Sequence, residues 1–298
     1  MKHLLSIETL AQPDMETILA DASNLKKERG RHAKLPLAGQ TWSMLFSKSS
    51  TRTRVSFEVG IRELGGQPIF LPAKEIQLGR GEPIKDTARV LGRMVHGAVF
   101  RTFAQSDVEE FAQYSRIPTI NALTDREHPC QILTDIFTFE ETRGPIKGKV
   151  VAFIGDGAGN VATSWIFAAD KAGFELRIAA PKAFQPPAEL LDRAQGKILI
   201  TEDVKAAAAG ADMLYTDVWV SMGREKESAD RNRLMSGYQI NAGLVQLARP
   251  GALVMHCLPA YRGKEIDDAT FEANAQTIFD QAENRLHVQK AILSWLVK

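Results

Sequence analysis

The feature that most constrains the fold of this 298-residue chain is a repeated alternation of short β-rich runs with loops or helix-like segments. The β-rich runs cover residues 41–46, 68–71, 97–101, 149–154, 175–179, 197–200, 213–216 and 252–256. Helical spacing is clear between them, for example in Ile84, Ala88, Leu91 and Val95, which follow an i, i+4, i+7 rhythm. Strands that alternate with helices predict an α/β fold, in which helices cover both faces of parallel sheets.

A polar, turn-rich segment at 141–148 interrupts this alternation, and a new series of strands and helices follows it. We therefore predict two doubly wound parallel-sheet domains, 1–143 and 144–281. Open parallel sheets bind ligands beyond the carboxyl ends of their strands. We expect the active site in the cleft between the two domains, with residues drawn from both.

The amino-acid composition indicates which kinds of molecule the protein binds. The 37 Lys and Arg residues nearly balance the 36 Asp and Glu residues, so no overall field would hold a nucleic acid or an anionic membrane. No stretch approaches the roughly 20 consecutive apolar residues of a membrane helix. The two cysteines, Cys130 and Cys257, lie far apart in the sequence, and the first residues lack the apolar segment of a secretion signal. These features predict a cytoplasmic protein that acts on small molecules.

The first chemical signal is the run Ser-Ser-Thr-Arg-Thr-Arg at 49–54, between a predicted strand and a helix that begins near Arg52. Free backbone N–H groups, the positive end of the helix dipole, several hydroxyls and a guanidinium suit a phosphate dianion. The plainer alternative is a Ser or Thr helix cap beside two solvated arginines. The run by itself only suggests a phosphate site.

The second signal combines Arg101, at the end of a predicted strand, with His128, Pro129 and Gln131. Pro129 is suited to the first position of a helix, which leaves His128 at its cap and Gln131 in its first turn. Arg, His and Gln donors together could polarise a carbonyl oxygen and stabilise the negative charge that develops on it. The alternative is that His128 merely caps its helix and Arg101 is a surface charge.

Two further signals follow later strands. Asp217 follows the predicted strand 213–216 and could hold an ammonium group. Met222 and Gly223 begin a charged loop that could act as a lid. Cys257, in the run His-Cys-Leu-Pro, follows the strand 252–256 and could contact an incoming amine. A plain surface loop and a small buried hydrophobic residue are the respective alternatives.

Together these four segments resemble the carbamoyltransferase family, and Ser-Met-Gly with His-Cys-Leu-Pro resembles its ornithine-using branch in particular. The resemblance covers essentially the whole chain, with four motifs in the family's order and spacing. It implies carbamoyl transfer from carbamoyl phosphate to the δ-amino group of L-ornithine, giving L-citrulline and phosphate in arginine biosynthesis, without a cofactor or metal. It also implies a terminal helix at 282–298 that packs back on the first domain, and a homotrimer or a multiple of trimers.

The resemblance also assigns site residues. Those matched to carbamoyl phosphate are Ser50, Thr51, Arg52, Thr53, Gln77, Arg101, His128, Pro129, Cys130, Gln131, Cys257, Leu258 and Arg285, with Gln77 at a position that can come from a neighbouring subunit. Those matched to ornithine are Asn160, Asp217, Ser221 and Met222. The expected catalytic residues are Arg101, His128, Gln131, Asp217 and Cys257. One departure stands before Asn160, where glycine replaces the first of two adjacent asparagines.

Three alternatives remain at this point. Another acceptor, such as putrescine, N-acetylornithine or aspartate, would keep the family but change the product. A nicotinamide-dependent oxidoreductase is suggested by the glycines at 155, 157 and 159, but Asn160 stands where the third glycine of that fingerprint belongs. A metal-sensing protein could use His128, Cys130, His256 and Cys257, although adjacent ligands seldom satisfy one tetrahedral ion.

Overall fold

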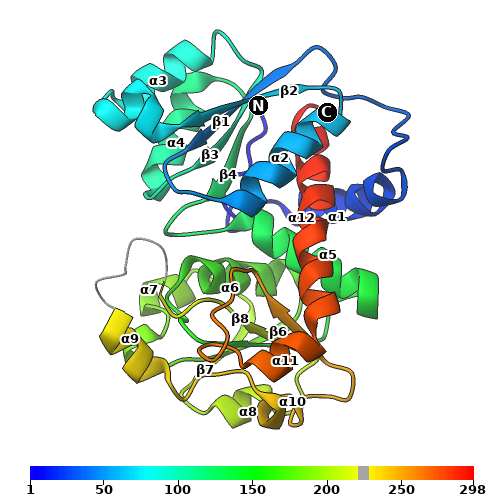
Figure 1. Cartoon of the computed structure of the whole chain (residues 1–298), viewed down its shortest axis with the longest axis vertical. Coiled ribbons are helices and arrows are strands. Elements are labelled where there is room, and N and C mark those ends of the chain that lie inside the picture. The colour runs from blue at the N-terminus through cyan, green and yellow to red at the C-terminus, as the bar shows by residue number, and fades with distance from the viewer. Residues whose placement is uncertain (221–227) are drawn as a thin grey trace. The chain divides into compact units, whose positions relative to one another are not determined.

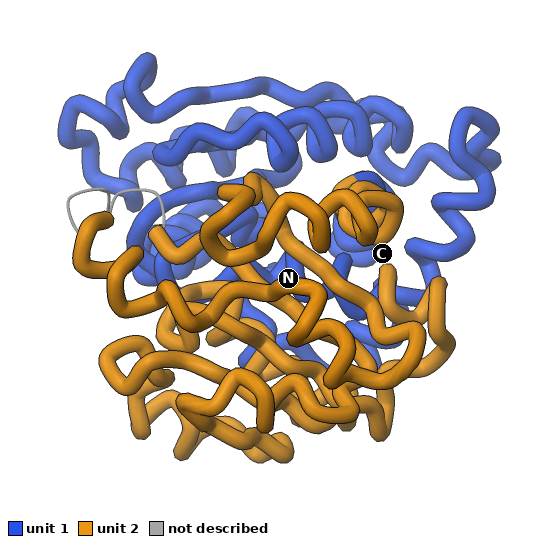
Figure 2. The backbone as a smooth tube through the Cα atoms, turned by 60° about the horizontal axis from the view of Figure 1, so that its bottom comes forward, with its two compact units in different colours: residues 1–137, 283–298 blue, residues 138–282 orange. Residues whose placement is uncertain are grey.

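The computed structural model describes residues 1–220 and 228–298. The described residues divide into two compact units, shown in blue and orange in Figure 2. Unit 1 comprises Met1–Phe137 with Glu283–Lys298, and unit 2 comprises Thr138–Ala282. Both ends of the chain therefore belong to unit 1, and two helices, α5 (Pro129–Arg143) and α12 (Ala275–Leu296), contribute residues to both units.

Unit 1, described throughout, is built on a four-stranded parallel sheet in the order β2-β1-β3-β4. Its strands are β1 (Thr41–Phe46), β2 (Gln67–Pro72), β3 (Gly97–Arg101) and β4 (Thr119–Leu123). Its helices are α1 (Gln12–Lys27), α2 (Thr51–Glu63), α3 (Ile84–Leu91) and α4 (Gln105–Ser115), with the 3₁₀ helices η1 (Ala73–Glu75) and η2 (Gln77–Arg80). Figure 1 shows α3 and α4 on one face of this sheet and α2 on the other. The strand order turns back between β1 and β3, which makes their carboxyl ends the switch point of the sheet.

Strand β4 is an element that the sequence pattern did not predict. Its middle residues, Asn121 and Ala122, have low intrinsic strand propensity. Contacts distant in sequence stabilise it instead, because Asn121 is fully buried and its amide donates to the carbonyl oxygen of Leu5 at 2.8 Å. Leu4 also bridges to Ile120 in parallel. Tertiary context thus overrides local preference in this strand.

Unit 2 contains, in its described part, a five-stranded parallel sheet in the order β7-β6-β5-β8-β9. Its strands are β5 (Val150–Ile154), β6 (Glu175–Ala179), β7 (Lys197–Thr201), β8 (Met213–Thr216) and β9 (Leu253–His256). Its helices are α6 (Asn160–Ala172), α7 (Ala188–Leu191), α8 (Val204–Ala208), α9 (Ser228–Met235), α10 (Ala242–Val245) and α11 (Asp268–Ala273), with the 3₁₀ helix η3 (Lys182–Phe184). The switch point of this sheet lies between β5 and β8.

Each unit has its own apolar core, as the nearly continuous hydrophobic strands predict for sheets covered on both faces. In unit 1 the rings of Phe100 and Phe111 meet edge to face at 5.4 Å. In unit 2 Tyr215 stacks on Phe153 with ring centroids 5.8 Å apart and meets Trp165 edge to face at 5.3 Å. The prediction of two parallel-sheet α/β domains is therefore confirmed.

The terminal helix α12 begins at Ala275, seven residues before the expected start at 282. Its last part joins unit 1 through polar contacts with α1 and α2. The fully buried Lys290 donates to Glu63 of α2 at 2.6 Å, and Trp295 donates to Asp14 of α1 at 2.7 Å. Among the described residues, no helix is long and apolar enough to cross a membrane.

Candidate active site

The switch point of unit 1 brings together the predicted phosphate-binding run and Arg101 of the predicted carbonyl-binding set. Phe46, the last residue of β1, pairs in register with Arg101, the last residue of β3. The chain that leaves β1 stays attached there, because the backbone N–H of Ser47 donates to the Arg101 carbonyl oxygen at 2.8 Å. The Ser-Thr-Arg-Thr run and Arg101 are therefore neighbours at one edge of one sheet, as their positions in the sequence suggested.

The N-terminus of α2 has the local structure expected of a phosphate loop. Ser50 is the cap residue, and its side chain accepts a hydrogen bond from the N–H of Thr53 at 3.2 Å. Thr51 is exposed, Arg52 is half-buried, and the first turn holds no acidic residue that would repel an anion. A helix of 13 residues presents its free N–H groups and positive dipole end at this point.

Arg285 of α12 reaches this loop from the other end of the sequence. Its Nη2 donates to the hydroxyl of Thr53 at 2.5 Å, and both residues are buried. A second guanidinium therefore lies at the α2 N-terminus, where it adds to the attraction for a dianion.

His128 is buried, and its pKa lies well below the ordinary value. Burial is the main cause, and the positive charges of Arg285 and Arg101 lower this pKa further. The imidazole is consequently neutral at physiological pH. A neutral imidazole can still donate one N–H to a carbonyl oxygen, so His128 remains suited to the role that the sequence suggested.

The first turn of α5 adds two fully buried side chains after Pro129. Burial raises the pKa of Cys130 to about 12, so Cys130 stays a thiol and is no nucleophile at neutral pH. Gln131 donates its Nε2 to Asp135 at 2.8 Å, and its Oε1 has no hydrogen-bond partner among the described residues. In this orientation Gln131 offers an acceptor, which suits the N–H₂ of a carbamoyl group. From the sequence we expected a donor at this position.

Gln77 is placed differently from the other residues of this set. It is exposed and opens η2, which follows the edge strand β2. The switch point lies on the far side of β1, between β1 and β3. Within unit 1, then, the topology does not group Gln77 with the α2 N-terminus.

The switch point of unit 2 gathers the described residues that were matched to the acceptor. Asp217 follows β8 and Asn160 opens α6, which follows β5. Thr216 connects the two strand ends, because its hydroxyl donates to the carbonyl oxygen of Ile154 at 2.7 Å. Ser221 and Met222 lie outside the described residues.

Cys257 and Asp217 form the closest pair in this group. The Sγ of Cys257 donates to Oδ1 of Asp217 at 2.9 Å, across the ends of the adjacent strands β8 and β9. Burial raises the pKa of Asp217, and this effect is partly offset by the charge of His256, the Cys257 hydrogen bond and the Val218 N–H. A half-buried carboxylate whose pKa is raised is well suited to an incoming amine or ammonium group.

The structure adds His256 and Glu265, which the sequence analysis had not placed in the acceptor site. Both side chains are fully buried, and Nε2 of His256 lies 3.2 Å from Oε1 of Glu265. The N–H of Leu258 donates to Nδ1 at 2.8 Å, so the neutral tautomer would carry its proton on Nε2, toward the carboxylate. The histidine immediately before Cys257 was a usable signal, but its pairing with Glu265 was not visible.

Leu258 has a left-handed backbone conformation, with φ at 60°. A bulky non-glycine residue seldom adopts this conformation, and such strain occurs preferentially at ligand sites. Its position, directly after Cys257, agrees with a functional role for this turn.

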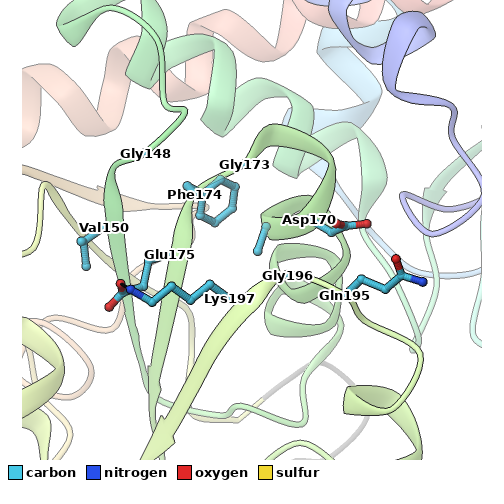
Figure 3. A pocket seen from close by; sticks show the side chains of 10 residues that line it. Gly148, Val150, Asp170, Gly173, Phe174, Glu175, Gln195, Gly196 and Lys197 are labelled. Atoms are coloured by element: carbon cyan, nitrogen blue, oxygen red, sulfur yellow. Dashed lines mark ion pairs between the residues drawn. The ribbon is translucent and has the colours of Figure 1, made fainter.

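A cavity of about 350 Å³ lies elsewhere in unit 2, at the amino ends of β5, β6 and β7 (Figure 3). It is lined by Val150, Glu175 and Lys197, each the first residue of its strand. Glu175 and Lys197 pair with each other there. None of the predicted site residues lines this cavity, and parallel sheets bind ligands at the opposite edge. Among the described residues, no group of three or more His, Cys, Asp or Glu side chains could hold a metal ion.

Two parallel α/β units, one with a helix terminus suited to an anion and the other with a half-buried carboxylate at its switch point, fit an enzyme class that joins an anionic donor to an amine acceptor. The aspartate/ornithine carbamoyltransferase carbamoyl-P binding domain matches residues 2–141, and the Asp/Orn binding domain of the same enzymes matches residues 147–296. The chain belongs to the aspartate/ornithine carbamoyltransferase family.

Named relatives cover nearly the full chain. The ornithine carbamoyltransferase of Akkermansia muciniphila is 54% identical over 99% of this chain and 98% of its own, and that of Campylobacter fetus is 48% identical with the same coverage. Among solved structures, the anabolic ornithine carbamoyltransferase of Campylobacter jejuni is 41% identical and superposes with a TM-score of 0.94, covering 99% of both chains. The Pyrococcus furiosus enzyme is 40% identical with a TM-score of 0.93, covering 99% of this chain and 97% of its own.

Proposed function

We propose that this protein transfers the carbamoyl group of carbamoyl phosphate to the δ-amino group of L-ornithine, forming L-citrulline and phosphate. The observation that carries the proposal is the hydrogen bond of 2.9 Å between the buried Cys257 and the half-buried Asp217, at the switch point of the Asp/Orn binding domain. A carboxylate with a raised pKa beside a thiol suits a primary amine. The proposal is supported by full-length relatives that are named ornithine carbamoyltransferases.

On the donor side, the phosphate of carbamoyl phosphate would bind at the N-terminus of α2. Ser50, Thr51, Arg52 and Thr53 supply hydroxyls, backbone N–H groups and a guanidinium, and Arg285 supplies a second guanidinium. Both positive charges would remain in place when phosphate departs, so the leaving group gains stabilisation without rearrangement of the protein.

The carbamoyl group would lie beside Arg101, His128 and Gln131. Arg101 and the neutral His128 would donate to the carbonyl oxygen, which gains charge as the amine attacks, while Oε1 of Gln131 would accept from the carbamoyl nitrogen. Pro129 and Cys130 would shape the turn, and Cys257 and Leu258 would complete the carbamoyl side. Gln77, which is exposed, would contact carbamoyl phosphate in a neighbouring subunit.

On the acceptor side, Asp217 and Cys257 would hold the δ-amine, and Asn160, Ser221 and Met222 would hold the amino-acid end of ornithine. An amine with a free-solution pKa of roughly 10 must lose a proton before it attacks, so the rate should rise with pH until the bound amine titrates. The carbonyl carbon forms a bond to the amine nitrogen, its bond to the phosphate oxygen breaks, and the amine proton passes to the solvent or the departing phosphate. The leaving group is already activated, so this scheme requires neither a metal nor a cofactor.

The remaining expectations also belong to this proposal. We infer a role in arginine biosynthesis, a cytoplasmic location, and a homotrimer or a multiple of trimers. The carbamoyl phosphate domain would span 1–143, joined by the terminal helix at 282–298, and the ornithine domain would span 144–281. The anabolic Campylobacter jejuni neighbour supports the biosynthetic direction.

The test is citrulline formation from carbamoyl phosphate and ornithine, run beside putrescine, aspartate and N-acetylornithine as acceptors. We expect product with ornithine and little with the others. Product with a different acceptor would preserve the donor-side assignments and overturn the roles given to Asp217, Ser221 and Met222. Absence of transfer to any acceptor would overturn the proposal.

A further inference from the structure

A buried ion pair lies at the carboxyl edge of the unit 2 sheet, outside the residues assigned above. Nη1 of Arg231, on α9, donates to Oδ2 of Asp156 at 2.7 Å, and the two side chains are only 4% and 10% exposed. Removing two charges from water is costly, and the attraction between them often does no more than offset that cost. Stability alone is therefore a poor explanation for this pair.

The guanidinium of Arg231 contacts segments that follow three strands. Asp156 follows β5, and the same Nη1 also donates at 3.1 Å to the carbonyl oxygen of Trp219, two residues after Asp217. The guanidinium carbon lies 4.7 Å from the ring centroid of Phe184, in η3, which follows β6. One side chain thus connects the segments that leave β5, β6 and β8.

Asp156 also stabilises the loop that precedes Asn160. Its Oδ1 accepts from the N–H of Ala158 at 3.1 Å, and its backbone carbonyl oxygen accepts from the N–H of Gly159 at 3.2 Å. Asn160 follows directly as the first residue of α6. A carboxylate that is fixed by Arg231 therefore also fixes the turn before Asn160, in the loop where glycine takes the place of an asparagine.

We infer that Asp156 and Arg231 are positioning residues of the acceptor site. They set the spacing between Asn160, after β5, and Asp217, after β8, and this spacing determines the affinity for the amino-acid acceptor. The inference rests on the proposed function, because it assigns ornithine to these two residues. Neither member of the pair belongs to the donor-side residues of unit 1.

The experiment compares steady-state constants for both substrates in Arg231→Met, Arg231→Lys and Asp156→Asn. We expect Arg231→Met to raise the KM for ornithine by about 10- to 100-fold, because small displacements of binding groups have effects of this size. The KM for carbamoyl phosphate should stay within about twofold, since a residue that acts only on the acceptor side does not bind the donor. Arg231→Lys, which keeps the charge but loses the planar fork, should give an intermediate KM for ornithine.

Arg233→Met is the matched control, because Arg233 lies on the same helix and its side chain is 73% exposed. It should leave both KM values unchanged. Circular dichroism melting is measured for every variant. If Arg231→Met does not fold, the KM values for ornithine of Asp156→Asn and Arg231→Lys test the inference.

Two results would overturn the inference. The first is an unchanged KM for ornithine in the folded variants, which, with a lower melting temperature, would show a purely structural pair. The second is an equal rise in both KM values. Wild-type protein that forms no citrulline would overturn the proposed function first, and this inference with it. The wild-type assay therefore separates the two failures.

Discussion

The surroundings of Asp217 disfavour the ionised form of its side chain. Burial is the main influence on its pKa, and it raises that pKa above the ordinary value of 3.8. The folded protein therefore binds this proton more tightly than the unfolded chain does. By linkage, the free energy of unfolding falls as the pH rises from the ordinary pKa of this carboxyl group to its raised pKa in the folded protein.

We predict that Asp217→Asn lowers kcat by about 100-fold or more while raising the melting temperature at pH 8. The amide oxygen can still accept from Cys257 and Val218, so the change removes the charge and keeps the hydrogen bonds. Asp203→Asn, at the exposed cap of α8, is the control and should leave kcat unchanged. Citrulline assays and thermal melts of both variants are the measurement. Wild-type turnover in Asp217→Asn would contradict the role assigned to the carboxylate.

At the scale of elements, α12 carries several ionisable side chains in buried positions. His287 is fully buried, and its pKa is lowered from 6.5 to about 4. Burial is the largest cause; the Glu283 hydrogen bond and charge oppose it, and the charges of Lys290 and Lys26 add to it. Between about pH 6.5 and 4 the unfolded chain binds more protons at this residue than the folded protein does. His287 therefore contributes to the loss of stability as the pH falls through that window.

The second prediction is that His287→Gln flattens the acid side of the stability profile. A pKa difference of this size corresponds to at most about 3 kcal/mol at pH 4, and the variant should lose less stability than wild type between pH 7 and pH 4.5. Urea midpoints measured at several pH values provide the comparison. His96→Gln, at an exposed position, should follow the wild-type profile. Parallel profiles for His287→Gln and wild type would show that acid unfolding begins elsewhere.

At the scale of the whole molecule, we expect the proposed site to depend on assembly, because of the position of Gln77. It is exposed, and the topology of unit 1 does not group it with the β1–β3 switch point. If Gln77 acts in a neighbouring subunit, each trimer combines residues of two chains at every site. A complete active site would then form only in the oligomer.

We predict that a mixture of Gln77→Ala and Arg52→Ala subunits, unfolded and refolded together, forms more citrulline at low carbamoyl phosphate than either variant refolded alone. Some mixed trimers would contain a site in which both residues are native. A mixture of Arg52→Ala with Arg101→Ala is the control, because these residues serve the same switch point of one chain and no complete site can form. Sedimentation should give a mass three times that of the chain or a multiple of it. A monomeric mass, or no gain in the first mixture, would refute the shared site.

The elements that could be predicted from the sequence are those whose cause is local. Pro129 at the start of α5 and Ser50 before α2 act within one helical turn, so these starts were predictable from neighbouring residues. The same holds for most strands, whose apolar runs needed no partner to be recognised. The two parallel sheets followed from the alternation of these elements, because a parallel connection requires a crossover, usually a helix.

What the sequence by itself determined, therefore, is the α/β architecture and the residue types at each strand end. Only the tertiary structure decided which distant groups meet: Arg285 with Thr53, His256 with Glu265, and Asp156 with Arg231. It also decided that Asn121 lies in a strand and that Gln131 offers an acceptor. The physical reason is that hydrogen bonds and ion pairs depend on separations of about 3 Å in space. Positions along the chain determine such separations only within a turn or two.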